Sequence, residues 1–125
     1  MPEIKTILVV EDEDAVLHLI CSNLEAVDCG IIVARSAEEA RECLLEIFVD
    51  MVIADYTRPV VEGETLFHWV REHPKYAKIT LVAIRSSQAP LRHKEVFDAS
   101  VVRPFNPQGL TKFVRRILSL PNPPS

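Results

Sequence analysis

Ile4-Lys5-Thr6-Ile7-Leu8-Val9-Val10-Glu11-Asp12-Glu13 is a mainly apolar run that passes directly into acidic residues. A short run of aliphatic residues of this kind is typical of a strand buried on both faces of a parallel sheet. Carboxylates that follow such a strand lie at its carboxyl end, which is the edge where open α/β sheets bind ligands. The stretch therefore predicts both an architecture and the edge of the sheet that carries a site.

The apolar pattern recurs along the chain and alternates with segments of helical spacing. Alternation of this kind predicts a doubly wound parallel sheet with helices on both faces. Asp14 is expected to cap the first helix, and Ser36-Ala37-Glu38-Glu39 has the pattern of a capping box that opens the second. The predicted strands are residues 4–10, 30–34, 50–54, 79–84 and 101–102, and the later helices are residues 66–72, a short 90–98 and 107–118, the last begun by Asn106 and Pro107.

Length and composition suit one compact domain. The chain has 125 residues, of which 48% are hydrophobic, and we expect residues 1–120 to form the domain and 121–125 a proline-rich tail. A net charge of -4 argues against direct binding of nucleic acid. No apolar run is long enough for a membrane span, so a cytoplasmic protein is expected. The three cysteines lie among apolar residues without paired spacing and are interpreted as reduced and structural.

Acidic residues follow two of the predicted strands. Glu11 and Asp12 come after the first and Asp55 after the third, so the three carboxylates share one cleft if those strands are neighbours. Such hard oxygen ligands suit Mg²⁺, which takes one or two carboxylates and completes its shell with water and phosphate oxygens. A structural interpretation is also open, because acidic residues stabilise helix amino termini and aspartates form turns.

Three segments resemble the receiver domains of bacterial response regulators. Residues 7–13 look like the first strand and acidic pair of that family, and residues 50–55 look like its phosphoacceptor segment, in which proline and glycine follow the aspartate four and eight positions on, here Pro59 and Gly63. Arg103-Pro104-Phe105 stands where the family usually has Lys-Pro-Phe. The resemblance implies a flavodoxin-like fold of five parallel strands in the order 2-1-3-4-5, flanked by five helices.

The family assignment implies a role for each site residue. Asp55 would accept a phosphoryl group from a sensor histidine kinase or a histidine phosphotransfer protein. Asp12 and Asp55 would bind Mg²⁺ directly, Glu11 would act through water, and the backbone carbonyl of Thr57 would complete the protein ligands. Arg103 would supply the cation that the family's lysine provides, on a cis peptide bond to Pro104. The domain would catalyse only its own phosphorylation and dephosphorylation, and would not be an enzyme in the usual sense.

Several positions depart from the family pattern. Arg85 stands where receivers carry a serine or threonine that binds the phosphoryl group, and Ser86 comes one residue late, so it can substitute only if the strand contains a bulge. Ser100 stands where the family often has an aromatic switch residue, and the segment from Arg85 to Arg103 is several residues shorter than in most receivers. The phosphoryl-accepting residues are therefore retained, whereas the residues that read out phosphorylation are altered.

Two other functions remain open. A phosphorylation-independent interaction module, or pseudo-receiver, would keep the fold and bind a partner through its helices. A small phosphatase is suggested by Asp55-Tyr56-Thr57, which loosely resembles the nucleophile loop of the haloacid dehalogenase group, but that group places its nucleophile after the first strand. The sequence identifies neither a downstream protein target nor an oligomeric state.

Overall fold

The computed structural model of the chain describes residues 4–25, 27–55, 60–61, 64–86, 96–103 and 107–118. Strands and helices alternate through the first half of the chain, as the sequence pattern predicts. In chain order they are β1 (Lys5–Val10), α1 (Asp14–Leu24), β2 (Cys29–Ala34), α2 (Ala37–Glu46), β3 (Met51–Asp55), β4 (Val60–Val61), β5 (Glu64–Thr65), α3 (Leu66–Arg71), the 3₁₀ turn η1 (Pro74–Tyr76), β6 (Thr80–Ser86), β7 (Ala99–Arg103) and α4 (Pro107–Leu118).

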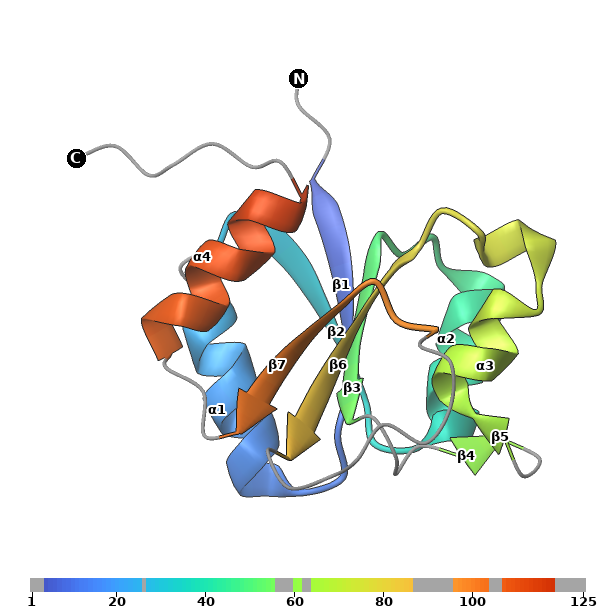
Figure 1. The fold of residues 1–125 in the computed structure, drawn as a ribbon, viewed down its shortest axis with the longest axis horizontal. Coiled ribbons are helices and arrows are strands. Elements are labelled where there is room, and N and C mark those ends of the chain that lie inside the picture. The colour runs from blue at the N-terminus through green and yellow to red at the C-terminus, as the bar shows by residue number, and fades with distance from the viewer. Residues whose placement is uncertain are drawn as a thin grey trace.

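Five of the strands form one parallel sheet in the order β2-β1-β3-β6-β7 (Figure 1). The predicted fold class and strand order are confirmed, with β6 and β7 as the fourth and fifth strands of the sheet. The short strands β4 and β5 form a separate antiparallel pair, which the sequence pattern did not predict. All five strands of the main sheet end at the same edge, so residues that follow them are brought together there.

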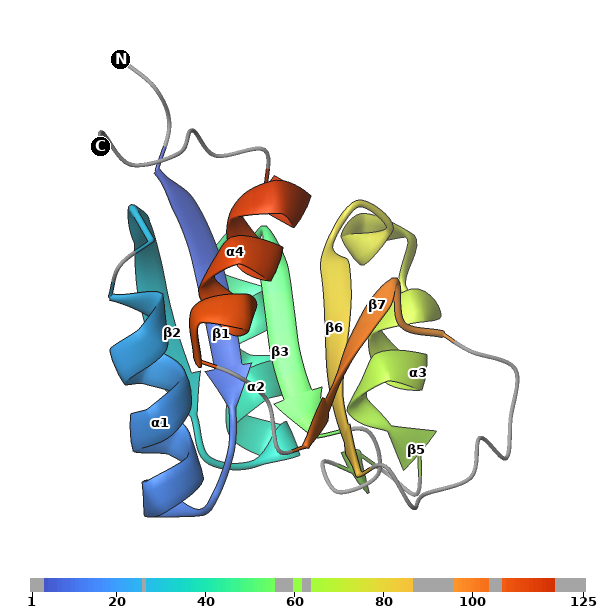
Figure 2. The same ribbon diagram turned by 60° about the vertical axis from the view of Figure 1, so that its left-hand side comes forward.

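Helices cover both faces of the sheet, with α1 and α4 on one side and α2 and α3 on the other (Figures 1 and 2). Side chains of β1 alternate between the two cores: Ile7 and Val9 face α1 and α4, and Leu8 and Val10 face the opposite layer. All four are buried, which explains why residues 7–10 of the strand are apolar without interruption. No helix in the described ranges is both long and apolar enough to span a membrane.

The start of α1 differs from its prediction. The helix begins at Asp14, and the capping position is Glu13, whose side chain makes no capping hydrogen bond. The Asp14 carboxylate instead accepts a hydrogen bond from the Arg35 guanidinium at 2.5 Å. Asp14 therefore pairs with a residue of the loop after β2 and does not cap the helix. The predicted cap was wrong, because its partner Arg35 is distant in sequence and could not be foreseen from the local pattern.

The predicted cap of α2 is confirmed. The Ser36 hydroxyl accepts a hydrogen bond from the backbone N–H of Glu39 at 3.1 Å. The Glu39 carboxylate accepts from the backbone N–H of Arg35 at 2.6 Å, one residue before the partner that a capping box normally uses. The Glu39 carboxylate and the Ser36 hydroxyl thus both fix the backbone where β2 passes into α2.

The remaining differences lie in the second half of the chain. Strand β7 extends over Ala99–Arg103, longer than the predicted 101–102, because β6 supplies a pairing partner along its whole length. Four α-helices lie in the described residues. Most of the predicted short helix at 90–98, as well as Pro104, Asn106 and the tail at 121–125, lie outside them.

We expect Ser36→Ala to lower the free energy of unfolding by about 1 kcal/mol, since it removes the acceptor for the first turn of α2. Urea unfolding followed by circular dichroism measures the change. Ser22→Ala is the matched control: Ser22 lies inside α1, where its hydroxyl donates to the carbonyl of His18 and alanine is the better helix former. Equal losses in both variants would contradict a capping role for Ser36.

Candidate functional site

The first and third strands are neighbours, so their acidic residues share one edge. Strand β1 pairs in parallel with β3, with Val10 opposite Ala54. The next position on each strand carries a carboxylate, Glu11 after β1 and Asp55 at the end of β3. The condition on which the predicted acidic cleft depended is therefore met.

Glu11 is held in place by its backbone and its side chain. Its N–H donates to the carbonyl of Ala34 at 3.0 Å, which fastens the end of β1 to the end of β2. Its Oε1 accepts from the N–H of Glu13 at 3.2 Å, and the residue is only 5% exposed. Asp12, the next residue, is exposed at the edge of the sheet. The two carboxylates thus differ, one fixed within the fold and the other open to solvent.

Asp55 is half-buried and lies in register with Ile84 of β6. Strand alternation places it on the face of Met51 and Ile53, the face that α1 and α4 cover. Asp55 thus ends the central strand at the carboxyl edge of the sheet.

A cation also reaches this edge, and sequence reasoning missed it. Arg35 follows β2, and its guanidinium pairs with Asp14 in the first turn of α1. The side chains are 53% and 82% exposed, so solvent screens this pair and its contribution to stability is small. Only the register of β1 with β2 brings the two together; no local pattern identifies the contact.

The chemistry of the donor set fits Mg²⁺. The carboxylates of Glu11, Asp12 and Asp55 are hard oxygen ligands that follow adjacent strands. Within the described ranges, no three His, Cys, Asp or Glu side chains gather closely enough to form a metal-binding group. Mg²⁺ does not require such a group, because it retains several waters and uses one or two carboxylates. Thr57, the predicted carbonyl ligand, lies outside the described residues.

Arg85 lies at the same edge, near the end of β6. Strand β6 pairs with β7 residue by residue through Ser86, without a bulge that would move Ser86 into the position of Arg85. By strand alternation Arg85 belongs to the face of Leu81 and Ala83, opposite that of Asp55. Its side chain is half-buried and its Nε is fully buried. The side chain therefore packs along the protein instead of extending directly into solvent.

The last predicted site residue ends the edge strand. Arg103 is the final residue of β7 and stands in register with Ser86. Ser100 lies within β7 opposite Ala83. The Arg103 side chain and the peptide bond to Pro104 lie outside the described part of the chain. The backbone thus delivers position 103 to the carboxyl edge that carries Asp55.

The cysteines take no part in this site. Cys21, Cys29 and Cys43 are unpaired thiols that pack against the cores. Burial, reinforced by neighbouring carboxylates, raises the pKa of each thiol above its ordinary value. Protonated thiols are poor nucleophiles and poor metal ligands, which agrees with the structural role predicted for them.

Comparisons with known proteins agree with this geometry. The sequence profile described as the response regulator receiver domain matches residues 7–115. The chain is 30% identical over 114 residues to the aerobic respiration control protein ArcA of Escherichia coli strain K12, covering 90% of this chain and 48% of that protein. It is 26% identical over 117 residues to the probable transcriptional regulator ycf27 of Guillardia theta, covering 93% of this chain and 46% of that protein. The chain thus spans about half the length of these relatives.

A solved structure is similar over nearly the whole chain. A putative response regulator from Chloroflexus aurantiacus superposes with a TM-score of 0.80 at 27% identity, covering 94% of this chain and 99% of that one. The match includes the order of the sheet and hence the edge at which Glu11, Asp12 and Asp55 lie.

Proposed function

The chain belongs to the response regulator receiver family, and from this premise we propose that it accepts a phosphoryl group on Asp55 in a Mg²⁺-dependent reaction. The observation that carries the proposal is the pairing of β1 with β3, which places Asp55 beside the Glu11–Asp12 turn. The phosphoryl donor would be a sensor histidine kinase or a histidine phosphotransfer protein in the cytoplasm. A downstream protein, not nucleic acid, would receive the signal from this domain.

In the proposed site, the residues would contribute to metal binding in different ways. Asp12 and Asp55 would be direct ligands, and the carbonyl of Thr57 would add a third. Glu11, which its own backbone contacts hold in place, would position a metal-bound water. When bound, Mg²⁺ offsets the negative charge that would otherwise repel an incoming phosphoryl group.

Asp55 is the nucleophile of the proposed reaction. One oxygen of its carboxylate forms a bond to phosphorus, while the phosphorus–nitrogen bond of the donor phosphohistidine breaks. The electron pair of that bond stays on the imidazole nitrogen, and the product on this chain is an acyl phosphate. Arg103, delivered to the same edge by β7, would bind the transferred group through its planar guanidinium.

A pseudo-receiver, which binds its partner without phosphorylation, is the second candidate function. The observation that favours it is Arg85 in place of a hydroxyl at the end of β6, on a strand whose pairing leaves Ser86 one position too late. Mg²⁺ binding separates the two functions. A receiver that accepts phosphate needs the metal, whereas an interaction module does not.

We expect Asp55→Asn to abolish phosphorylation, since the amide is not nucleophilic. The measurement is intact mass after exposure to acetyl phosphate and Mg²⁺. Asp28→Asn, a change at an exposed aspartate before β2, should label as the unaltered chain does. If Asp55→Asn still gains one phosphoryl group, the acceptor lies elsewhere.

Asp12→Ala should weaken Mg²⁺ binding by at least about tenfold, and by more than Glu11→Ala does. The reason is that a direct ligand contributes more than one that acts through water. Calorimetric titration with MgCl₂ measures both affinities, and far-ultraviolet circular dichroism establishes that each variant is folded. Equal losses would reject this order of importance.

Arg85→Thr should strengthen Mg²⁺-dependent labelling, because it restores a hydroxyl where the family binds the phosphoryl group. The labelling rate, the lifetime of the acyl phosphate and the affinity for Mg²⁺ are the three measurements. Arg116→Thr, at an exposed arginine of α4, controls for the loss of one positive charge. If both variants leave all three quantities unchanged, Arg85 has no role in the site.

A further inference from the structure

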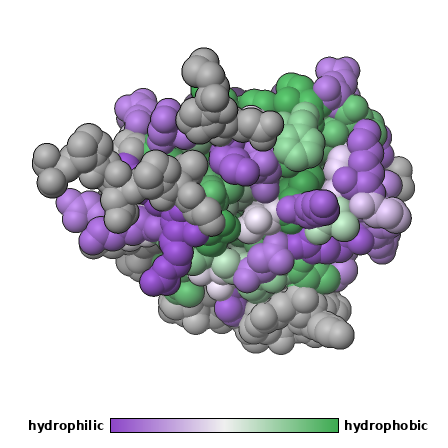
Figure 3. All heavy atoms as spheres, turned by 90° about the horizontal axis from the view of Figure 1, so that it is seen from above, coloured by the Kyte–Doolittle hydropathy of each residue, from purple (hydrophilic) through white to green (hydrophobic). Residues whose placement is uncertain are grey.

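Exposed apolar side chains gather at the opposite edge of the sheet from Asp55. Leu45 is 57% exposed, Ile47 43% and Phe48 80%, and all three lie in the segment 45–48, where α2 passes into β3. Figure 3 looks onto this amino edge and shows hydrophobic side chains facing solvent among hydrophilic ones. Single exposed apolar residues are common on protein surfaces, but a contiguous group marks a surface that another molecule covers.

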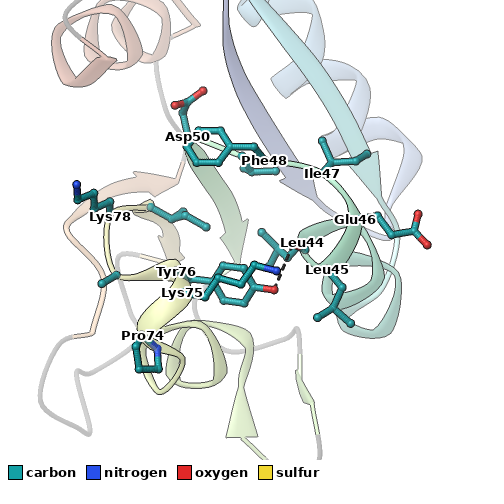
Figure 4. Close-up of a pocket in the computed structure, with 13 residues that line it drawn as sticks. Leu44, Leu45, Glu46, Ile47, Phe48, Asp50, Pro74, Lys75, Tyr76 and Lys78 are labelled. Carbon is teal, nitrogen blue, oxygen red and sulfur yellow. Dashed lines mark hydrogen bonds between the residues drawn. The ribbon is translucent and has the colours of Figure 1, made fainter.

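These side chains border a cavity of about 680 Å³ between the end of α2 and η1 (Figure 4). Its floor is fixed: Tyr76 is 4% exposed, and its hydroxyl donates to the carbonyl of Leu44 at 3.1 Å, joining η1 to α2. Pro74, Ala77 and Ile79 complete the wall on the side of η1. The hollow is therefore a formed, mainly apolar surface with rigid sides.

A small molecule would account for only part of this surface. It could fill the hollow and contact Leu45 and Phe48, which line it, but these side chains are so exposed that a ligand inside the hollow would cover only part of their surface. A protein surface laid across the rim covers both the hollow and the projecting side chains. The occupant is therefore a macromolecule with an apolar contact surface.

Charges of both signs lie on the rim. Figure 4 shows Glu46 and Lys78 on opposite sides of the cavity, each pointing away from it. Both residues are exposed. Consider a second copy related by a two-fold axis that lies in the contact plane, midway between Glu46 and Lys78. Glu46 of each copy then faces Lys78 of the other, which gives two such pairs. The rim is thus complementary to itself, as a two-fold symmetric interface requires.

We propose that this amino-edge groove binds a second copy of the same chain, forming a two-fold dimer around Phe48 and the Glu46–Lys78 pairs. The dimer leaves the carboxyl edge open, because the strands separate the groove from Asp55. The dimer is therefore compatible with phosphoryl acceptance and does not depend on it. It should form equally well in Asp55→Asn.

The charged pairs allow a decisive experiment by sedimentation velocity over a range of concentrations. Lys78→Glu and Glu46→Lys should each weaken self-association at least about tenfold, because each places like charges opposite one another. An equal mixture of the two variants should associate again, since a heterodimer restores both attractive pairs in reversed polarity. The double variant should also self-associate, for the same reason.

Phe48→Glu should abolish the dimer, whereas Leu19→Glu, at an exposed apolar position on α1, should not change it. Near-ultraviolet circular dichroism checks that each variant keeps its packing. The proposal is wrong if the unaltered chain remains a monomer up to about 1 mM, the weak limit of specific association. It is equally wrong if the mixed charge variants fail to associate, or if Phe48→Glu and Leu19→Glu behave alike.

Discussion

The parallel pairing of β1 with β2 on one side and β3 on the other is the constraint on which the rest of the structure depends. Ile7, Leu8 and Val9 have no exposed surface, because helices cover both faces of the strand and neighbours occupy both of its edges. A strand with alternating polar and apolar residues can leave one face in solvent. A strand buried on both faces and paired at both edges has its register and its end positions determined by its neighbours. The position of Glu11 beside Asp55 follows from that fixed end.

Parallel pairing also gives the molecule two chemically different edges. At the carboxyl edge, Glu11 and Asp55 lie at the ends of neighbouring strands, and Arg35 and Arg85 lie at the ends of β2 and β6. At the amino edge, helix ends and turns meet, and the apolar residues of segment 45–48 remain outside the two cores. The charges concentrate where phosphoryl chemistry is proposed, and the apolar surface lies where it cannot obstruct that chemistry. The separation of the charged edge from the apolar edge follows from the parallel topology alone.

Local patterns allowed the fold to be predicted, and distant contacts explain where prediction failed. The five strands and the Ser36 cap follow from residues adjacent in sequence, and the structure confirms them. Asp14 was misassigned because its partner, Arg35, lies on another loop. The amino-edge groove could not be predicted, since nothing in the sequence indicates that segments 44–50 and 74–79 meet. That Glu11 and Asp55 lie at the ends of neighbouring strands was predictable because the family motif specifies which strand ends come together.

The central place of β1 has a consequence for the growing polypeptide. Strand β1 comes first in the chain order of the sheet, and its second neighbour, β3, is not complete until residue 55 has been synthesised. A nascent chain that ends earlier carries the apolar residues 7–10 of β1 on a strand with one edge unpaired, an arrangement prone to association with other chains.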